Sequence, residues 1–187
     1  MPILPLEPQM FPPDLLEAAA ADSADERAWW VLHTRPRQEK SLARNLYAAQ
    51  IPFYLPLTRG QTRIRNRLTT STLPLFTSYL FLRANQQERV AALATSRVVH
   101  SLRVADQRQL LRDLAQVNRL LQLGVPVTAE DRLIPGALVE IQCGPLAGLR
   151  GKIVQAATGK RFIVEVDFLQ RGASVLVEGF TLVPSGV

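Results

Sequence analysis

The sequence has few of the residues from which catalytic and metal centres are usually built. Its 187 residues include one cysteine and two histidines, and no apolar run approaches the ~18 residues of a membrane-spanning helix. The single cysteine, Cys143, excludes an intramolecular disulfide and a cysteine-based zinc cage. The start of the chain has no positively charged n-region and no long apolar stretch, so we expect no secretion signal. We therefore expect a cytoplasmic protein that does not associate with membranes.

The same scarcity predicts that the protein is not an enzyme. His33 and His100 each lie in an expected strand, without a second ligand at metal-binding spacing. Cys143 precedes Gly144-Pro145 in an expected turn, with no histidine nearby to activate it. The acids between residues 29 and 124 are scattered over expected helices or their starts and form no carboxylate pair. They are Glu39, Glu88, Asp106 and Asp113. We expect no catalytic site, no metal and no cofactor.

Acids are scarce in the part of the chain where bases gather. Residues 1–28 hold six acids and one base, residues 29–124 hold four acids and fifteen bases, and residues 125–187 hold six of each. The formal net charge of +6 therefore averages three unlike parts, and the middle one, at +11, favours a local anionic partner. Of the 22 bases, 19 are arginine. This fits phosphate recognition by the guanidinium fork, and it fits a codon bias equally well.

Order is expected to begin at Trp29. Residues 1–28 carry five early prolines and are expected to form a flexible acidic extension, in which residues 14–27 could form a weak helix. Strands are expected at 29–34, 51–57, 78–83 and 98–104, and helices at 38–50, 86–95 and 107–123. The last helix carries Leu110, Leu114, Val117 and Leu121 on one stripe. This order predicts an α/β sandwich over residues 29–123, with helices packed on a mainly antiparallel sheet.

The remaining chain predicts a second, smaller domain. Residues 124–135 are expected to be an exposed linker. From 136 to 187, apolar and polar residues alternate in short stretches at 138–141, 152–156, 162–168 and 174–178, separated by glycines. Short strands with glycine turns are typical of a small β-barrel. The fold class is therefore predicted to be α+β, with a sandwich followed by a barrel.

Two features are candidates for function. Arg59, Arg63, Arg65 and Arg67 lie in a polar, threonine-rich stretch without acids, and the last three would share one face of an extended hairpin. Such a ridge can grip a phosphate backbone, although a solvated loop would have the same composition. The second feature is the apolar stretch 74–82, in which Tyr79 and Phe81 point to the same face of a strand. This pair is either an exposed protein-binding patch or part of a core buried on both faces.

At these residues the sequence resembles the NusG family of transcription elongation factors. Residues 29–39 resemble the opening of the family's N-terminal (NGN) domain, and Pro74-Leu75-Phe76 with Tyr79-Leu80-Phe81 resembles its signature strand. Residues 136–154 resemble its KOW motif, an SH3-like five-stranded barrel. Gly144, Pro145 and Gly148 suit the tight turns of that motif and Gly151 suits a bend in a strand. The three motifs come in order over residues 29–184.

The resemblance implies a monomer that binds RNA polymerase at the clamp helices of the largest subunit and suppresses pausing or termination. By motif position, Tyr79 and Phe81 correspond to the clamp-binding patch, with Leu110 and Leu114 at its border. The arginine segment 59–67, with Arg35 and Arg37, would approach the non-template DNA strand or nascent RNA. The KOW domain would recruit ribosomal protein S10, the termination factor Rho or RNA. An alternative function is a KOW-type RNA-binding module that acts with the ribosome.

The sequence departs from the family pattern at two places. Thr77-Ser78 stands where members often have Pro-Gly, and Phe168-Leu169-Gln170-Arg171 replaces a Phe-Gly-Arg pattern common in housekeeping members. The Arg-Pro-Arg-Gln-Glu sequence at 35–39 is more similar to specialised paralogues of the RfaH type. Together with the arginine-rich segment and the acidic extension, it favours an operon-specific paralogue.

Overall fold

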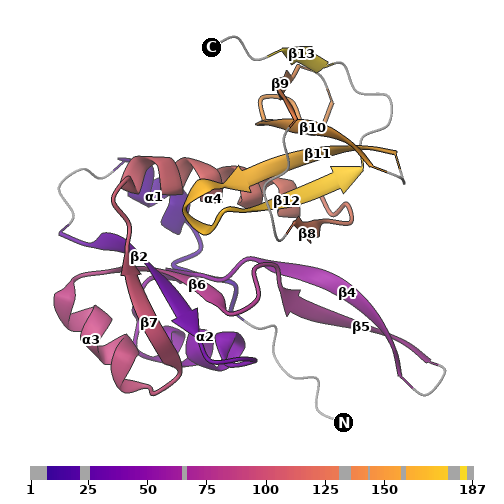
Figure 1. Cartoon of the computed structure of the whole chain (residues 1–187). Coiled ribbons are helices and arrows are strands. Elements are labelled where there is room, and N and C mark those ends of the chain that lie inside the picture. Colours follow the sequence, from indigo (N-terminus) through magenta and orange to yellow (C-terminus); the bar gives the residue numbers. More distant parts are fainter. Residues whose placement is uncertain are drawn as a thin grey trace. The chain divides into compact units, whose positions relative to one another are not determined.

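The structure is a computed structural model that describes residues 8–21, 26–64, 67–130, 136–142, 144–156, 159–176 and 182–184 (Figure 1). The chain divides into two compact units. The first consists of Met1–Leu57 and Phe76–Gln107, and the second of Thr58–Leu75 and Arg108–Val187. Each unit contains its own antiparallel sheet.

The first unit is a five-stranded antiparallel sheet with three helices. Its strands follow the order β1-β3-β6-β2-β7. They are β1 (Met10–Phe11), β2 (Ala28–Thr34), β3 (Phe53–Tyr54), β6 (Tyr79–Ala84) and β7 (Val98–Arg103). The helices are α1 (Leu15–Ala21), α2 (Glu39–Ala48) and α3 (Gln86–Ala94). The strands and helices predicted over 29–104 are thus present, although the one expected at 51–57 is limited to β3.

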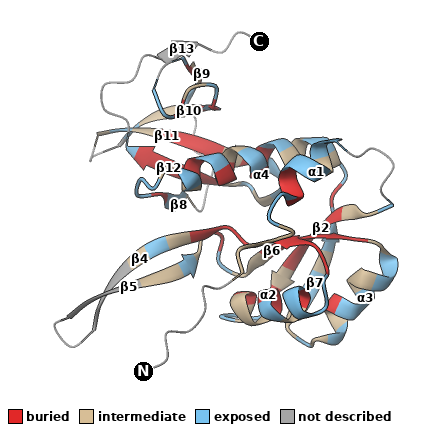
Figure 2. Cartoon of the chain, turned by 180° about the vertical axis from the view of Figure 1, so that it is seen from behind, coloured by how far each residue is buried: buried red, intermediate tan, exposed pale blue. Residues whose placement is uncertain are grey.

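One face of this sheet forms a core with α2. Leu32 and Leu80 lie directly opposite each other on β2 and β6, and both are fully buried together with Leu42 and Leu46 of α2. Figure 2 shows the central strands β2 and β6 as largely buried. The helix α3 begins with a capping box, in which the Asn85 side chain accepts the N–H of Glu88 and the Glu88 carboxylate accepts the N–H of Asn85. Local sequence therefore fixes where this helix starts.

The entry to β6 is held by a buried carboxylate. Ser78 adopts a left-handed backbone conformation with φ of 66°, which glycine favours and other residues adopt at a cost. Its N–H donates to Oε1 of Glu39 at 2.7 Å, and its carbonyl accepts the N–H of Thr34 at 2.9 Å. Glu39 is 3% exposed. The departure from Pro-Gly at Thr77-Ser78 therefore keeps the backbone bend that a glycine would make.

The second unit contains an antiparallel sheet in the order β13-β9-β10-β11-β12-β8. Its strands are β8 (Thr128–Glu130), β9 (Ala137–Ile141), β10 (Arg150–Ala156), β11 (Gly159–Val166), β12 (Arg171–Leu176) and β13 (Leu182–Pro184), with a 3-10 turn at Asp167–Leu169. The unit also holds most of α4 (Gln107–Gln122) and the two-stranded sheet β4 (Leu57–Ile64) and β5 (Arg67–Pro74). Buried side chains of the larger sheet include Phe162, Val164 and Val175.

These elements confirm the predicted α+β fold class, with two corrections. The expected flexible extension contains β1 and α1, because Met10 and Phe11 pair with Tyr54 and Phe53 of β3, and the apolar side chains at the start of α1 are buried. Segment 124–135, expected to be an exposed linker, contributes β8, a sixth strand besides the five that follow residue 136. The boundaries 29–123 and 136–187 stay predictions.

We expect Ser78→Gly to raise the free energy of unfolding by about 0.5–1 kcal/mol. The left-handed conformation costs a non-glycine residue ~1–2 kcal/mol. Glycine avoids this cost but loses more conformational entropy on folding, so the net stabilisation is smaller. Thermal unfolding with Ser78→Ala as the control separates this effect from loss of the hydroxyl, since alanine keeps the Cβ and should give no gain. A lower melting temperature for Ser78→Gly would contradict the assigned strain.

Candidate functional site

The aromatic pair expected to form an exposed patch is divided between surface and core. Tyr79 is half-buried, whereas Phe81 is fully buried. The ring of Phe81 lies 6.4 Å from that of Tyr54 and 6.3 Å, edge-on, from that of Phe76. Of the two alternatives for this pair, the structure favours core burial for Phe81, because the rings of Tyr54 and Phe76, which lie outside its own strand, cover it. Tyr79 is the member of the pair whose side chain a partner can reach.

A row of rings runs from Tyr79 across the sheet. His33 lies opposite Tyr79 on β6 and opposite His100 on β7, with ring centroids 5.3 Å and 6.3 Å apart. His33 is half-buried and His100 is exposed. The two histidines are 67 positions apart in sequence, and only strand pairing between β2 and β7 brings them together. Groups of three or more potential metal ligands are absent from the described residues.

The predicted border of the patch, Leu110 and Leu114, lies on α4 and is also buried. Val117 and Leu120 are buried as well, whereas Leu121, expected on the same stripe, is half-buried. The buried face of α4 is therefore broad. In this structure neither Leu110 nor Leu114 is exposed for a partner.

The predicted arginine ridge lies on the two-stranded sheet. Arg59 is exposed on β4, Arg63 lies in β4 and Arg67 begins β5. The segment is thus extended, as the sequence predicted. Arg65 and the side chains of Arg63 and Arg67 lie outside the described residues, so their shared face stays a prediction.

Arg35 and Arg37 lie in the connection from β2 to α2, and both are exposed. The N–H of Arg35 donates to the carbonyl of Arg97 at 2.8 Å, which ties this connection to the residue just before β7. Arg37 has a φ of 62° and is followed by α2. The two arginines predicted to contact nucleic acid are therefore accessible to an anionic ligand.

The glycines of the predicted KOW turn adopt the conformations expected of them. Gly144 and Gly148 have φ of 86° and 81°, and the N–H of Gly148 donates to the carbonyl of Ile141 at 2.7 Å. A Cβ at Gly151 would clash with the carbonyl oxygen of Ile163 on the neighbouring strand. Pro145 is exposed in the turn, while Cys143 lies outside the described residues. Gly144 and Gly148 thus have the positive φ that a tight turn requires, and Gly151 lies in β10 where a side chain would not fit.

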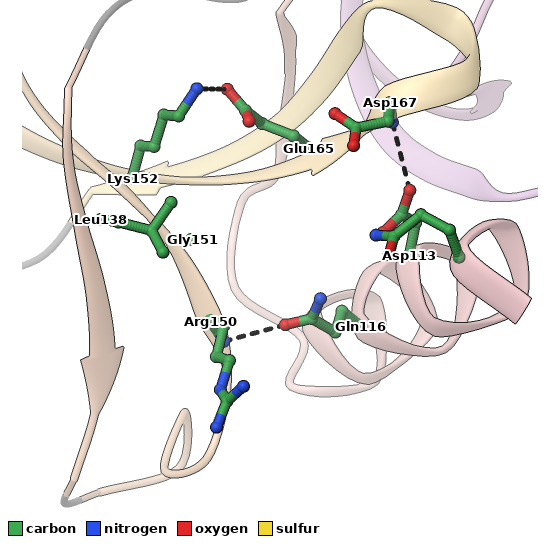
Figure 3. Close-up of a pocket in the computed structure, with 9 residues that line it drawn as sticks. Asp113, Gln116, Leu138, Arg150, Gly151, Lys152, Glu165 and Asp167 are labelled. Carbon is green, nitrogen blue, oxygen red and sulfur yellow. Dashed lines mark hydrogen bonds and ion pairs between the residues drawn. The ribbon is translucent and has the colours of Figure 1, made fainter. Parts of the chain in front are cut away.

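Two polar side chains of α4 accept hydrogen bonds from backbone N–H groups of β10 and of the 3-10 turn that follows β11 (Figure 3). Asp113 Oδ2 accepts the N–H of Asp167 at 3.1 Å, and Gln116 Oε1 accepts the N–H of Arg150 at 2.8 Å. The pocket between them also contains the Lys152–Glu165 ion pair, with Nζ and Oε1 2.8 Å apart. Its lining residues are Gln109, Asp113, Gln116, Leu138, Arg150, Gly151, Lys152, Glu165 and Asp167. This contact could not be predicted from the sequence, because it joins α4 to residues more than 30 positions away.

Asp113 is the carboxyl group of this pocket that is most perturbed. Burial raises its pKa to about 6, and hydrogen bonds from the Asp167 N–H and the Gln109 side chain oppose the rise. Since the folded pKa lies above the ordinary aspartate pKa of 3.8, the folded state binds more protons than the unfolded state between these two pH values. Stability from this group is present at low pH and is lost as the pH rises toward 6. The Asp113 carboxylate therefore holds backbone and side-chain donors within its own unit, at a cost in stability when it is charged.

We expect Asp113→Asn to stabilise the protein at pH 7 to 8 by about 1–3 kcal/mol, since it removes a buried charge and keeps the acceptor for the Asp167 N–H. The gain should disappear toward pH 4, where the wild-type carboxyl is protonated. Thermal unfolding of both proteins over this pH range measures it. Glu17→Gln on α1, an acid outside this pocket, is the control. A destabilised Asp113→Asn protein at pH 8 would overturn the assignment.

None of the described helices is long and apolar enough to cross a membrane. No curated protein matches the chain. A solved structure describing domain interaction in Thermotoga maritima NusG is similar at 17% sequence identity and a TM-score of 0.43, covering 81% of this chain and 93% of that one. The family described as transcription termination factor nusG matches residues 27–134. This match spans more than half of the sequence, so the chain belongs to the NusG family, whose members bind RNA polymerase and act in transcription elongation and termination.

Proposed function

We propose that this protein binds RNA polymerase at the clamp helices of its largest subunit and acts as an elongation or antitermination factor. The observation that carries the proposal is the position of Tyr79 on β6, where it is half-buried at the end of a row of rings with His33 and His100. Partly exposed aromatic side chains are typical anchors of protein interfaces. Membership of the NusG family supplies the class of partner.

The arginines support a second contact, with nucleic acid inside the transcription complex. Arg35, Arg37 and Arg59 are exposed. The extended strands β4 and β5 carry further arginines. Positive charge on an extended two-stranded element suits a phosphate backbone, and it does not require base-specific contacts. We propose the non-template DNA strand or nascent RNA as the ligand.

The C-terminal sheet is proposed to be the KOW domain that recruits a further partner. Its turn has the required glycine conformations at Gly144 and Gly148. Gln170 has a left-handed backbone conformation with φ of 52° just before β12. It lies in the stretch 168–171, which replaces the Phe-Gly-Arg pattern common in housekeeping members. The altered residues at 168–171 support an operon-specific paralogue of the RfaH type.

The charges of this sheet argue against the alternative, an RNA-binding module acting with the ribosome. Three of its bases already have acidic or hydroxyl partners. Arg150 pairs with Glu140 at 2.9 Å, Lys152 pairs with Glu165, and Arg161 donates to the Ser174 hydroxyl. Binding of RNA to this sheet would have to compete with these contacts. The polymerase-directed function is therefore favoured.

Tyr79→Ala is expected to weaken binding to core RNA polymerase about 30-fold, because an aromatic anchor contributes ~2 kcal/mol. Tyr79 suits this test better than Phe81, whose truncation would open a cavity in the core. The matched control is Tyr47→Ala on α2, where the tyrosine is 49% exposed. If wild type and Tyr79→Ala bind with equal affinity and have the same circular dichroism, Tyr79 is not a polymerase-binding residue. Transcription over pause sites with both variants then measures the functional consequence.

Replacing Arg63, Arg65 and Arg67 with alanine should weaken binding to the elongation complex and make it less dependent on salt. Each lost contact to a single-strand phosphate lowers the log–log slope by ~0.7. The control triple variant replaces Arg103, Arg108 and Arg112, which are exposed elsewhere and give the same change in net charge. If both triple variants change the slope equally, the effect is one of net charge and the ridge assignment fails.

A further inference from the structure

The outer edge of the C-terminal sheet is covered by a strand from the segment that precedes it. β8 is three residues long, and it pairs with β12 from Glu130 opposite Gly172 to Thr128 opposite Ser174. On its other side, β12 pairs with β11 over all six of its residues. The β8 side of β12 is thus only half used.

β8 buries little apolar surface. Thr128 and Ala129 are exposed, and Glu130 is the one residue of the strand that is partly buried. A short edge strand held mainly by backbone hydrogen bonds belongs to the least stable part of a sheet. What distinguishes β8 from a loosely attached strand is therefore the environment of Glu130.

The side chains of Ser174 and Arg161 hold the Glu130 carboxylate. The Ser174 hydroxyl donates to its Oε1 at 2.5 Å, and Nε of Arg161 lies 3.4 Å from the same oxygen. The guanidinium of Arg161 also donates to the Ser174 hydroxyl oxygen at 3.0 Å and 2.6 Å. Ser174 is fully buried. The buried Ser174 hydroxyl on β12, which Arg161 on β11 positions, can therefore donate to a carboxylate on whichever strand pairs with β12.

The pairing of β8 stops for a local reason. Continuing the register would place Val127 opposite Val175 and Pro126 opposite Leu176. Pro126 has no N–H to donate, and the carbonyl of Val127 accepts the Thr58 hydroxyl at 3.2 Å. Leu176 is left 49% exposed. A strand without this proline could pair further along β12 and cover Leu176.

We propose that β8 is a removable cap on β12, and that the edge beneath it accepts an extended segment of a protein partner carrying a carboxylate at the place of Glu130. Side chains opposite Gly172, Ser174 and Leu176 lie on the same face of the sheet. The partner segment therefore has an apolar residue four positions before its acid and no proline between them. This proposal rests on the recruiting role proposed for this sheet and gives its binding surface.

Tethering makes the cap a strong competitor. A strand joined to the sheet by a short connection has an effective concentration of order millimolar, so a partner gains access in proportion to the fraction of open molecules. Weakening the contacts of the Glu130 carboxylate raises the fraction of open molecules. A partner segment that pairs with more residues of β12 than β8 does would be favoured over the cap. The cap β8 therefore determines how tightly a partner segment must bind β12 in order to displace it.

Residue-resolved hydrogen exchange on the full chain tests the cap. In Glu130→Gln, the β12 amides bonded to β8 should exchange about tenfold faster, while those bonded to β11 change less than about twofold. The matched control is Glu140→Gln, which removes an acid paired with the exposed Arg150. Equal acceleration of both sets of amides would show that β8 is integral to the sheet, which would overturn the proposal.

A peptide tests the edge. The probe has the sequence of residues 124–131 with Pro126→Leu, and its control also carries Glu130→Gln. The probe should shift amide resonances of Gly172–Leu176 and bind the full-chain Glu130→Gln variant about tenfold more tightly than wild type, because both measurements depend on the same open fraction. The control peptide should bind at least about tenfold more weakly than the probe. Equal binding of both peptides, or resonance shifts outside β12, would overturn the proposal. Polymerase binding by Tyr79 is measured separately, so failure here leaves that function intact.

Discussion

A hydrogen bond between a buried carboxylate and one backbone N–H fixes the strand on which the candidate surface depends. Glu39 opens α2 and holds Ser78, whose left-handed conformation starts β6. Because strand side chains alternate, this starting point sends Leu80 and Leu82 toward the core with α2 and sends Tyr79 and Phe81 to the other face. A shift of one residue would exchange the two sets, and the row of rings across β6, β2 and β7 would be lost.

Charge is used differently in different parts of the molecule. In the second unit, several acids and bases bond each other or backbone groups, as Lys152 of the larger sheet does with Glu165 and Asp113 of α4 does with the Asp167 N–H. The described arginines that face solvent include Arg35, Arg37 and Arg59. Part of the positive charge of residues 29–124 is thus accessible, whereas several charges of the neutral last third are held in ion pairs. This division supports nucleic acid as a ligand of the former and a protein as a ligand of the latter.

The features that the sequence predicted well are those decided by nearby residues. Periodicity predicted α2, α3, α4 and the strands β2, β6 and β7, and the capping box at Asn85 begins α3 within a few residues of chain. Gly144 and Gly148 were predicted to require positive φ, which they have. The candidate site was predicted less well. Phe81 is covered by Tyr54 and Phe76, and His33 meets His100, through contacts between segments that are distant in sequence.

The sequence alone determined the fold class, the order of the elements, the turn glycines and the uneven distribution of charge, because steric preference, periodicity and composition act over short stretches of chain. Only the tertiary structure decided that β1 and α1 are ordered, that Phe81 is buried while Tyr79 remains accessible, and that the linker supplies β8 to the edge of β12. These outcomes depend on strand register and on which distant side chains meet. Neither is set by local preference, since a strand edge accepts any segment whose backbone and side chains fit it.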